Sequence, residues 1–262
     1  MIRALYTAAS GMSAQQANLD TVANNLANSA TAGFRSRKMQ FEDMIYQNMI
    51  TPGSAQSQQT VSNGLQIGLG TRSASSEVIM TQGDFNETDN PLDLAIQGAG
   101  FFQVSQPDGT IAYTRAGNFQ KNNQGLIVTA DGNTLLPAIT IPSNATSVTI
   151  SQYGIVSATI PGQTAPAQLG TIQLATFANP GGLNSVGGNL FTQTESSGNA
   201  ITDVPGGSTG MGTLQEGYLE NSNVDVVSEF VQMILAQRAY ESNSKVIHVA
   251  DDMYSQINGM IR

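Results

Sequence analysis

Apolar residues recur at seven-residue intervals along the first 34 positions of the chain. Leu5, Met12, Leu19 and Leu26 form the repeat, and Ala8, Gln15 and Val22 fall between them at alternate steps of three and four. This spacing keeps one stripe on one face of an α-helix, in the manner of a coiled-coil seam. Because Arg3 and Asp20 are the only charged residues in this stretch, we expect a helix with neighbours on more than one side.

The end of the chain carries a matching stripe. Its repeat is Met233, Tyr240, Ile247, Tyr254 and Ile261, with Ala236, Asn243, Ala250 and Ile257 at the intermediate positions. Ser222 and Asp225 precede the stripe at the spacing of a capping box, which predicts where the helix starts. Two long helices of matching period therefore bracket the chain. The plainer alternative is an antiparallel helix pair that only covers the core of one domain.

Residues 36–76 begin with a segment, up to about Tyr46, that mixes charged and bulky residues and could be a short helix or a strand. The rest of this range is polar with few charges. Pro52-Gly53 and Asn63-Gly64 are turn signals within it. A linker is the default interpretation of such a composition. The β-branched residues near Val61 and Ile67 also allow a long β-hairpin that extends from the body of the protein.

Between residues 77 and 221 the pattern changes to short apolar runs separated by Gly-, Pro-, Asn- and Asp-containing turns. About nine strands at this spacing, with no helical period among them, predict an antiparallel sandwich or barrel. The predicted fold class is therefore α+β, with two long terminal helices packed as a coiled-coil-like pair, an extended β-arm and a mainly antiparallel β outer domain. The predicted domains are 1–35 with 222–262, 36–76, and 77–221.

Composition limits the classes of partner. Charged residues make up 11% of the 262 residues, against about 25% in a typical soluble domain. Such a surface fits a subunit packed among other subunits, because interfaces are depleted in Lys, Glu and Asp. A net charge of −9 with ten basic residues argues against nucleic-acid binding, which needs a basic patch.

The chain contains no Cys, which excludes disulfides and thiolate metal sites. No apolar run reaches the ~20 residues that span a bilayer, so we expect no direct membrane insertion. The amino terminus also lacks the features of a secretory signal. If the protein leaves the cytoplasm, we expect export without a cleaved signal peptide.

Three asparagines near the end of the first helix, Asn24, Asn25 and Asn28, fall off the seam. We expect their amides to bond the backbone of an adjacent element, or to end the helix before Gly33, which can adopt a left-handed conformation. The alternative is that all three are solvated.

One enzyme hypothesis deserves a test. Gly206-Gly207-Ser208-Thr209-Gly210 matches the nucleophile elbow of an esterase, and Asp225 and His248 follow in the required order. The elbow needs a strand before the Ser and a helix after it, but the surrounding sequence is rich in turns. His248 is the only His, and Gly98-Ala99-Gly100 between two apolar runs predicts a turn or bulge. We therefore predict no catalytic residue, no cofactor and no metal site.

Four segments in this order resemble the flagellar rod and hook axial proteins. They are Ala23 to Asn28 with Thr31, Gly33 and Phe34; Asp93 to Phe102; Tyr113 to Phe119; and Gly217 to Glu220 continuing through Ser222 to Asp225 and Gln237 to Glu241. Each motif alone is modest, but four in order are specific and cover nearly the whole chain. The polar segment from Tyr46 to Ile67 and the chain length resemble the subunits of the distal rod.

The resemblance implies a structural protein that polymerises with itself into a helical tube and transmits torque to the hook. Heterologous contacts that do not close produce such filaments. It also implies inner-tube helices, an extended arm and an outer β-domain. The implied partners are proximal rod proteins and the hook protein at the two ends, the surrounding L and P ring proteins, and the type III export apparatus. The implied location is the flagellar basal body, from the periplasm to the outer membrane.

Three sets of residues are candidates for assembly. The helix seams are Leu5, Met12, Leu19, Val22, Leu26, Met233, Tyr240, Ile247, Tyr254 and Ile261, the family motif is Asn24, Asn25, Asn28, Gly33 and Phe34, and the arm is Pro52, Gly53, Asn63, Gly64 and Ile67. We expect both termini to be largely unfolded in the free subunit and to order on assembly. The alternatives are a hook or proximal-rod protein of the same family and, outside it, an adhesin or other extracellular β-domain.

Overall fold

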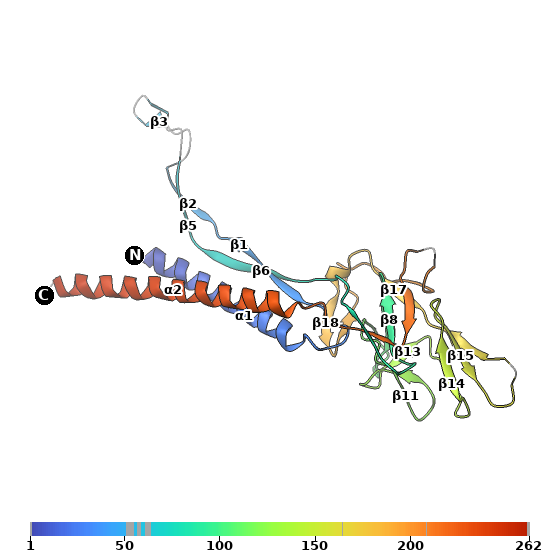
Figure 1. Cartoon of the computed structure of the whole chain (residues 1–262). Coiled ribbons are helices and arrows are strands. Elements are labelled where there is room, and N and C mark those ends of the chain that lie inside the picture. Colours follow the sequence, from blue (N-terminus) through green and yellow to red (C-terminus); the bar gives the residue numbers. More distant parts are fainter. Residues whose placement is uncertain are drawn as a thin grey trace. The chain divides into compact units, whose positions relative to one another are not determined.

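A computed structural model describes residues 2–50, 55–56, 59–60, 64–163, 165–207 and 209–260 (Figure 1). The chain forms two compact units, which are described separately. The first comprises Met1–Ala27, Arg37–Val78 and Asp225–Arg262, and the second comprises Asn28–Ser36 and Ile79–Val224. Two helices and many antiparallel strands confirm the α+β class. Pro52, Gly53, Asn63, Ser208 and Ile261 lie outside the described residues.

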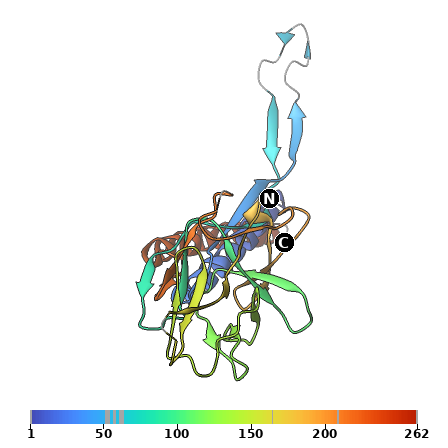
Figure 2. The same cartoon turned by 90° about the vertical axis from the view of Figure 1, so that its right-hand side faces the viewer.

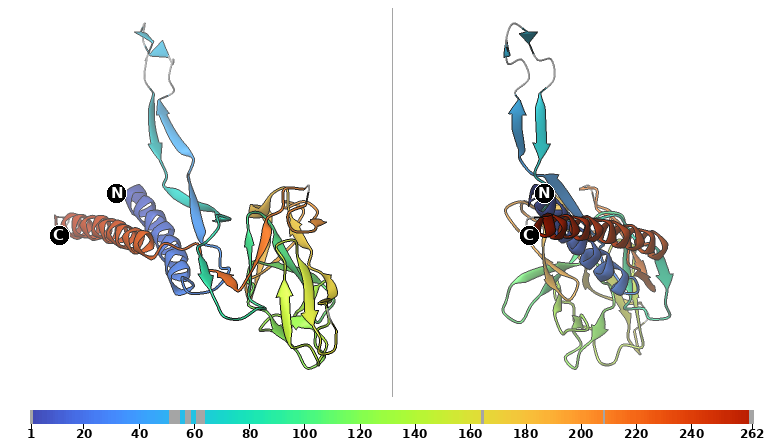
Figure 3. Two further views of the ribbon diagram at one scale, coloured as in Figure 1. Left: turned by 45° about the vertical axis from the view of Figure 1, so that its right-hand side comes forward. Right: turned by 90° about the vertical axis from the view of Figure 1, so that its left-hand side faces the viewer.

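The first unit contains both long helices, α1 (Ile2–Ala27) and α2 (Val226–Met260). They run antiparallel: Asn25 near the end of α1 contacts Glu229 near the start of α2, and Gly11 approaches Asn243. The start of α1 and the end of α2 therefore lie at the same end of the pair (Figure 3). Neither helix, over the part of the chain that the structure describes, is apolar enough to cross a membrane.

Helix α2 starts at Val226, and Asp225 is its N-cap. The Asp225 carboxylate accepts a hydrogen bond from the Val227 N–H at 3.1 Å and another from the Ser228 hydroxyl. This satisfies one of the donors that a helix start leaves without an intrahelical partner. The predicted capping box is therefore wrong, because Ser222 lies outside the helix and its hydroxyl accepts from the Val224 N–H at 3.3 Å.

A long two-stranded ribbon completes the first unit. Strand β1 (Arg37–Asp43) pairs with β6 (Thr71–Val78), β2 (Tyr46–Ile50) with β5 (Leu65–Gly68), and β3 (Ala55–Gln56) with β4 (Gln59–Thr60), all antiparallel. Figure 2 shows β2 and β5 side by side. Every residue of β2 and β5 is exposed. Because the strands pair antiparallel, the stretch for which the sequence allowed a linker or a hairpin forms a hairpin in the described residues.

The second unit is built around a nine-stranded antiparallel sheet. Its main path runs in the order β11-β12-β13-β9-β10-β19-β18, and β17 joins β20 to β9. The bounds are β9 (Phe101–Ser105), β10 (Ile111–Thr114), β11 (Gln120–Lys121), β12 (Ile127–Val128), β13 (Thr134–Leu136), β17 (Leu174–Thr176), β18 (Asn184–Gly187), β19 (Leu190–Thr192) and β20 (Ile201–Asp203).

Smaller antiparallel sheets complete this unit, together with the 3-10 helix η1 (Pro180–Gly182). A three-stranded sheet has the order β14-β15-β16, and β8 pairs with β21 and β7 with β22. The bounds are β7 (Phe85–Glu87), β8 (Leu94–Gln97), β14 (Ser147–Ile150), β15 (Ile155–Thr159), β16 (Ala167–Thr171), β21 (Thr213–Glu216) and β22 (Tyr218–Glu220).

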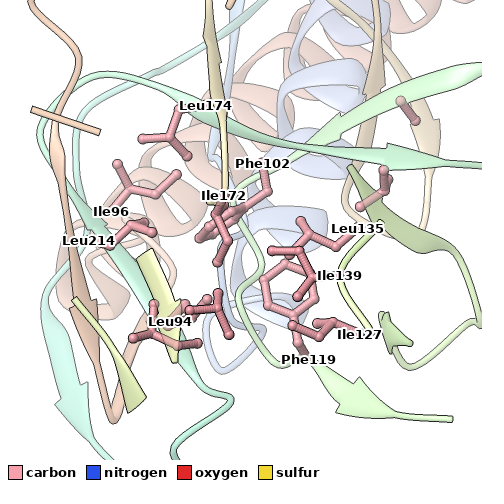
Figure 4. Packing of buried hydrophobic residues seen from close by; sticks show 14 of the residues in the cluster. Leu94, Ile96, Phe102, Phe119, Ile127, Leu135, Ile139, Ile172, Leu174 and Leu214 are labelled. Atoms are coloured by element: carbon pink, nitrogen blue, oxygen red, sulfur yellow. The ribbon is translucent and has the colours of Figure 1, made fainter. Parts of the chain in front are cut away.

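One apolar core holds these sheets together (Figure 4). Strand β9 contributes to it from the middle of the large sheet, with its first four residues buried. Phe102 meets Phe119 edge to face, with ring centroids 5.0 Å apart, and both are at most 1% exposed. At roughly 1.5–3 kcal/mol for each large apolar side chain buried, this core accounts for much of the stability of the unit.

Candidate assembly interface

The most buried positions of the predicted stripes occur on both helices. Ala8 and Val22 on α1, and Ala236 and Ala250 on α2, are between 2 and 5% exposed. The other described seam residues are partly buried, apart from Tyr240, which is 39% exposed: Leu5, Met12, Leu19, Leu26, Met233, Ile247 and Tyr254. The structure therefore uses much of the stripes within one chain, and their role between copies stays a prediction.

The helices approach closely at Gly11. A Cβ at this position would lie 2.8 Å from Nδ2 of Asn243, so an Ala there would displace the Asn side chain. Gly11, a weak point for helix stability, thus has a packing role. Towards the end of α2, an apolar hollow of about 330 Å³ is lined mainly by Ala4, Val246, Val249 and Met253.

Sequence reasoning missed a second apolar face on α2. We call it the α2 ridge: Val227, Phe230, Val231, Ile234 and Leu235, each between 48 and 72% exposed. Their spacing places them on one face. Val231 and Ile234 each lie two residues from the stripe positions Met233 and Ala236, hence about 200° around the helix. These five apolar residues and their spacing are visible in the sequence, but the prediction is based on the longer stripe, which repeats every seven residues.

Helix α1 also has a second face. We call it the α1 outer face: Tyr6, Ala9, Ser13, Gln16, Asp20, Ala23 and Ala27, all exposed. Ala9 and Ser13 each lie two residues from Gly11, which faces α2, so this face points about 200° away from that contact. The helix pair thus presents a large apolar surface on one side and a surface of mostly small residues on the other.

Asn25 joins three elements of the first unit. This side chain is 1% exposed. Its Nδ2 donates to the Arg37 carbonyl at 2.8 Å and to Oε1 of Glu229 at 3.1 Å, and its Oδ1 accepts from the Arg37 N–H at 2.9 Å. The expectation that an amide of this group bonds an adjacent backbone is confirmed for Asn25. Elsewhere in the motif, Asn24 is exposed and Asn28 Oδ1 accepts from the Thr31 hydroxyl at 3.2 Å.

Glu229 is the ionisable member of this junction. Burial raises the pKa of its carboxyl, the hydrogen bond from Asn25 opposes this, and the nearby Asp225 charge raises the pKa further. Oε1 holds the Asn25 bond, whereas Oε2 is buried and has no hydrogen-bond partner among the described residues. The carboxyl therefore favours its neutral form more than a solvated glutamate does.

The ribbon displays apolar side chains on its surface. Met44, Ile45, Tyr46, Met49, Ile50, Leu65 and Ile67 are exposed. Of the predicted arm residues, Ile67 pairs with Gln47 across the ribbon and Gly64 is partly buried. A two-stranded ribbon is marginal alone in water, so apolar contacts with another surface would stabilise it.

The second unit encloses a buried ion cluster of Arg35, Arg115 and Glu220. Arg35 Nη2 lies 2.6 Å from Glu220 Oε1, and Arg115 Nη1 lies 3.6 Å from Glu220 Oε2. The Gly83 N–H donates to the same Oε1 at 3.0 Å. The three side chains are at most 6% exposed. Arg115 also donates to the carbonyls of Ile96 and Gly98.

Two guanidinium groups thus share one carboxylate. Burial lowers the pKa of Arg115 to about 10, with Glu220 raising it and Arg35 lowering it. Arg115 still carries its proton at neutral pH, since 10 lies well above 7. The cluster therefore holds an excess positive charge inside the protein, and loss of the carboxylate would leave both cations without a counter-charge.

The cluster and its hydrogen bonds bring all four sequence motifs together, because Arg115 of the third motif contacts Glu220 of the fourth and the carbonyls of the second. Gly33, which has the predicted left-handed backbone (φ 70°), donates its N–H to the Glu220 carbonyl at 2.8 Å. A Cβ at Gly33 would lie 2.4 Å from the Ala116 nitrogen, so only glycine fits. Phe34 is partly buried, and its N–H donates to the Thr31 carbonyl. Residues far apart in sequence therefore fix the chain where it enters and leaves this unit.

The esterase hypothesis fails on geometry. Asp225 caps α2 and His248 lies on the same helix 23 residues later, so roughly 35 Å of helix separates them at 1.5 Å per residue. Asp225 and His248 cannot share a triad. The turn predicted at Gly98-Ala99-Gly100 is confirmed, because φ is 110° at Gly98 and 137° at Gly100, between β8 and β9.

Three family models match successive parts of the chain. They are described as flagella basal body rod protein (residues 5–35), flagellar hook protein FlgE/F/G D1 domain (95–158) and flagellar basal body rod FlgEFG protein C-terminal (215–260).

Individual relatives match over almost their full length. The flagellar basal-body rod protein FlgG of Caulobacter vibrioides is 50% identical, covering 96% of this chain and 97% of the relative. The proteins of the same name from Borreliella burgdorferi and Bacillus subtilis are 46% and 40% identical, each covering 100% of both chains. The chain therefore belongs to the flagellar basal-body rod protein family, as a structural subunit and not an enzyme.

Proposed function

We propose that this protein is the subunit of the distal rod, which polymerises with itself into a rigid helical tube and transmits motor torque to the hook. The observation that supports this most is the similarity to rod proteins named FlgG along the whole chain. The charge-poor α1, with two charged residues, Arg3 and Asp20, within its bounds, suits a helix surrounded by other helices.

In this proposal the chain has three working parts. Residues 1–35 with 222–262 form the inner tube, in which the helices pack as a coiled-coil-like pair and the seam residues contribute contacts between copies. Residues 36–76 form an extended arm, and 77–221 form the outer domain. The helices order on assembly, because isolated helices are marginal in water and most of their stability comes from packing.

The proposed partners follow from the position in the flagellum. Copies of the chain contact one another along the tube, proximal rod proteins lie at one end and the hook protein at the other, and the L and P ring proteins surround it. The tube extends from the periplasm to the outer membrane, and the type III apparatus exports its subunits.

The arm is proposed to make the rod stiff by bridging neighbouring copies. Its exposed apolar residues, such as Ile45 (84% exposed) and Met49 (53% exposed), would be buried against the neighbouring copy. Deletion of Gln47 to Leu65 should leave rods that assemble but bend more easily, measured as curvature in electron micrographs. Straight rods of unchanged stiffness would remove this role from the arm.

Gene deletion tests the proposed function as a whole. Cells without this chain should make basal bodies that stop short of the outer membrane and carry no hook, and expression of the chain should restore both. Electron microscopy of isolated basal bodies measures this directly. Complete rods and hooks in the deletion strain would contradict the assignment.

A further inference from the structure

The α2 ridge needs a partner outside its own helix pair. Its five residues are 48 to 72% exposed, and they face away from the contact with α1. Water-exposed apolar residues gathered on one helix face mark interaction surfaces more often than scattered ones do. The surface that covers the ridge must therefore consist of apolar or small side chains, and it must leave room for a helix to pack on it.

The α1 outer face matches the α2 ridge in its position along the helix pair and in the size of its side chains. Within one chain, Asn25 on α1 lies at the same height along the helix pair as Glu229 on α2, and Gly11 at the same height as Asn243. For an antiparallel pair, residues of α1 and α2 at equal height therefore have numbers that add to 254. By this register Ala23 is level with Val231 and Ala27 with Val227. Small residues thus lie at the height of the large ridge residues, and small side chains leave room for large ones between packed helices.

The positions of two oppositely charged residues agree with this register. Asp20 lies on the α1 outer face at the height of Ile234, one turn from Arg238 on α2. The Arg238 side chain is 77% exposed, and among the described residues it pairs with Glu241 at 3.2 Å. Such an exposed pair contributes little, which leaves the guanidinium able to meet a second carboxylate.

We propose that the α2 ridge of one copy packs on the α1 outer face of a second copy at the same height, with Arg238 meeting Asp20. The inference rests on the proposed function, since it names one contact by which rod subunits would join. Because the two surfaces lie on opposite sides of the helix pair, the contact is heterologous and leaves a free ridge and a free outer face for further copies.

Disulfide trapping tests the contact, because the chain has no Cys of its own. Val231→Cys and Ala23→Cys are combined in one chain, expressed as the sole copy in the parent bacterium, and oxidised in isolated basal bodies. Within one chain the two positions lie on opposite sides of a helix pair whose axes are about 8–10 Å apart, beyond the Cα separation of up to about 7 Å that a disulfide allows. Each disulfide therefore joins two copies.

The expected result is a ladder of dimers, trimers and longer oligomers. The matched control is Val231→Cys with Ala9→Cys, which lies on the same face but fourteen residues, or about 21 Å, along the helix, and should give no ladder. A ladder from the control alone would overturn the register. Dimers from Val231→Cys alone would show ridge against ridge and overturn the heterologous contact.

The outcome separates this inference from the proposed function. If the cysteine variant is found in rods but gives no ladder, the inference is refuted and the rod assignment stays intact. If the wild-type chain is absent from basal bodies, the assignment itself is refuted. If the cysteine variants fail to assemble, charge reversal replaces them. Asp20→Arg should lose most flagella, and Asp20→Arg with Arg238→Asp should regain them, whereas no recovery in the double variant overturns the contact.

Discussion

At the scale of single residues, Glu220 is the side chain whose loss should cost most. It is the only carboxylate that the described structure places beside the guanidinium groups of Arg35 and Arg115, in a site at most 6% exposed. A buried ion pair contributes little compared with a well-packed apolar substitute, but breaking one leaves a charge buried without compensation.

Glu220→Gln should therefore lower the free energy of unfolding by about 3–5 kcal/mol, measured by urea denaturation. The control is Glu42→Gln, which removes the exposed pair of Glu42 and Arg72 at 2.9 Å and should cost about 1 kcal/mol or less. Equal losses in the two variants would show that the buried cluster has no special role.

Glu229 should make stability depend on pH. Its pKa is raised in the folded protein from the ordinary value of 4.5, mainly by burial, so the folded state holds the proton more tightly than the unfolded state. This contribution is fully present below pH 4.5 and is lost as the pH rises through the folded pKa. The effect is small because the group is only partly buried.

Glu229→Gln should consequently flatten the pH dependence just above pH 4.5. The readout is the difference between the unfolding midpoints of wild-type and variant rods, in which the helices are ordered, across this range. This difference removes the opposite trend from Asp225, whose pKa is lowered by its hydrogen bonds with Ser228 and Val227. Parallel pH profiles for the two proteins would contradict the raised pKa.

At the scale of elements, Asn25 attaches the ribbon to the helix pair. Its amide satisfies both the N–H and the carbonyl of Arg37 at the start of β1. Asn25→Ala leaves these groups and the Glu229 carboxyl without their partner, so we expect a loss of about 1–3 kcal/mol in local stability.

Hydrogen exchange at the Arg37 amide in assembled rods, where α1 is ordered, measures this attachment. Exchange should speed up in Asn25→Ala and stay unchanged in Gln16→Ala, an exposed position on the same helix. Unchanged protection of Arg37 in the Asn25 variant would mean that the ribbon is held by other contacts.

The elements also show how far the sequence predicts the structure. The helices and the strands of the β unit follow from apolar period and turn residues, both of which are local. The ion cluster does not, because Arg35 and Glu220 are 185 residues apart and no local pattern pairs their charges. The spacing of the α2 ridge is also local, but the long stripe that faces the other helix is the stronger signal in the sequence.

At the scale of the whole molecule, we expect one unit to fold by itself and the other to need further copies of the chain. Residues 79–224 with 28–36 contain the apolar core and the ion cluster. The helices instead carry exposed apolar residues, such as Val227 at 72% and Leu235 at 64%. Polymerisation should therefore depend on α1 and α2 and not on the β unit.

The most direct measurement compares the full chain with a fragment of residues 28–224 by sedimentation over a range of concentrations. We expect the fragment to fold cooperatively and to stay monomeric at concentrations at which the full chain forms polymers. A fragment that polymerises as readily as the full chain would contradict this expectation, because the helices would then not carry the assembly.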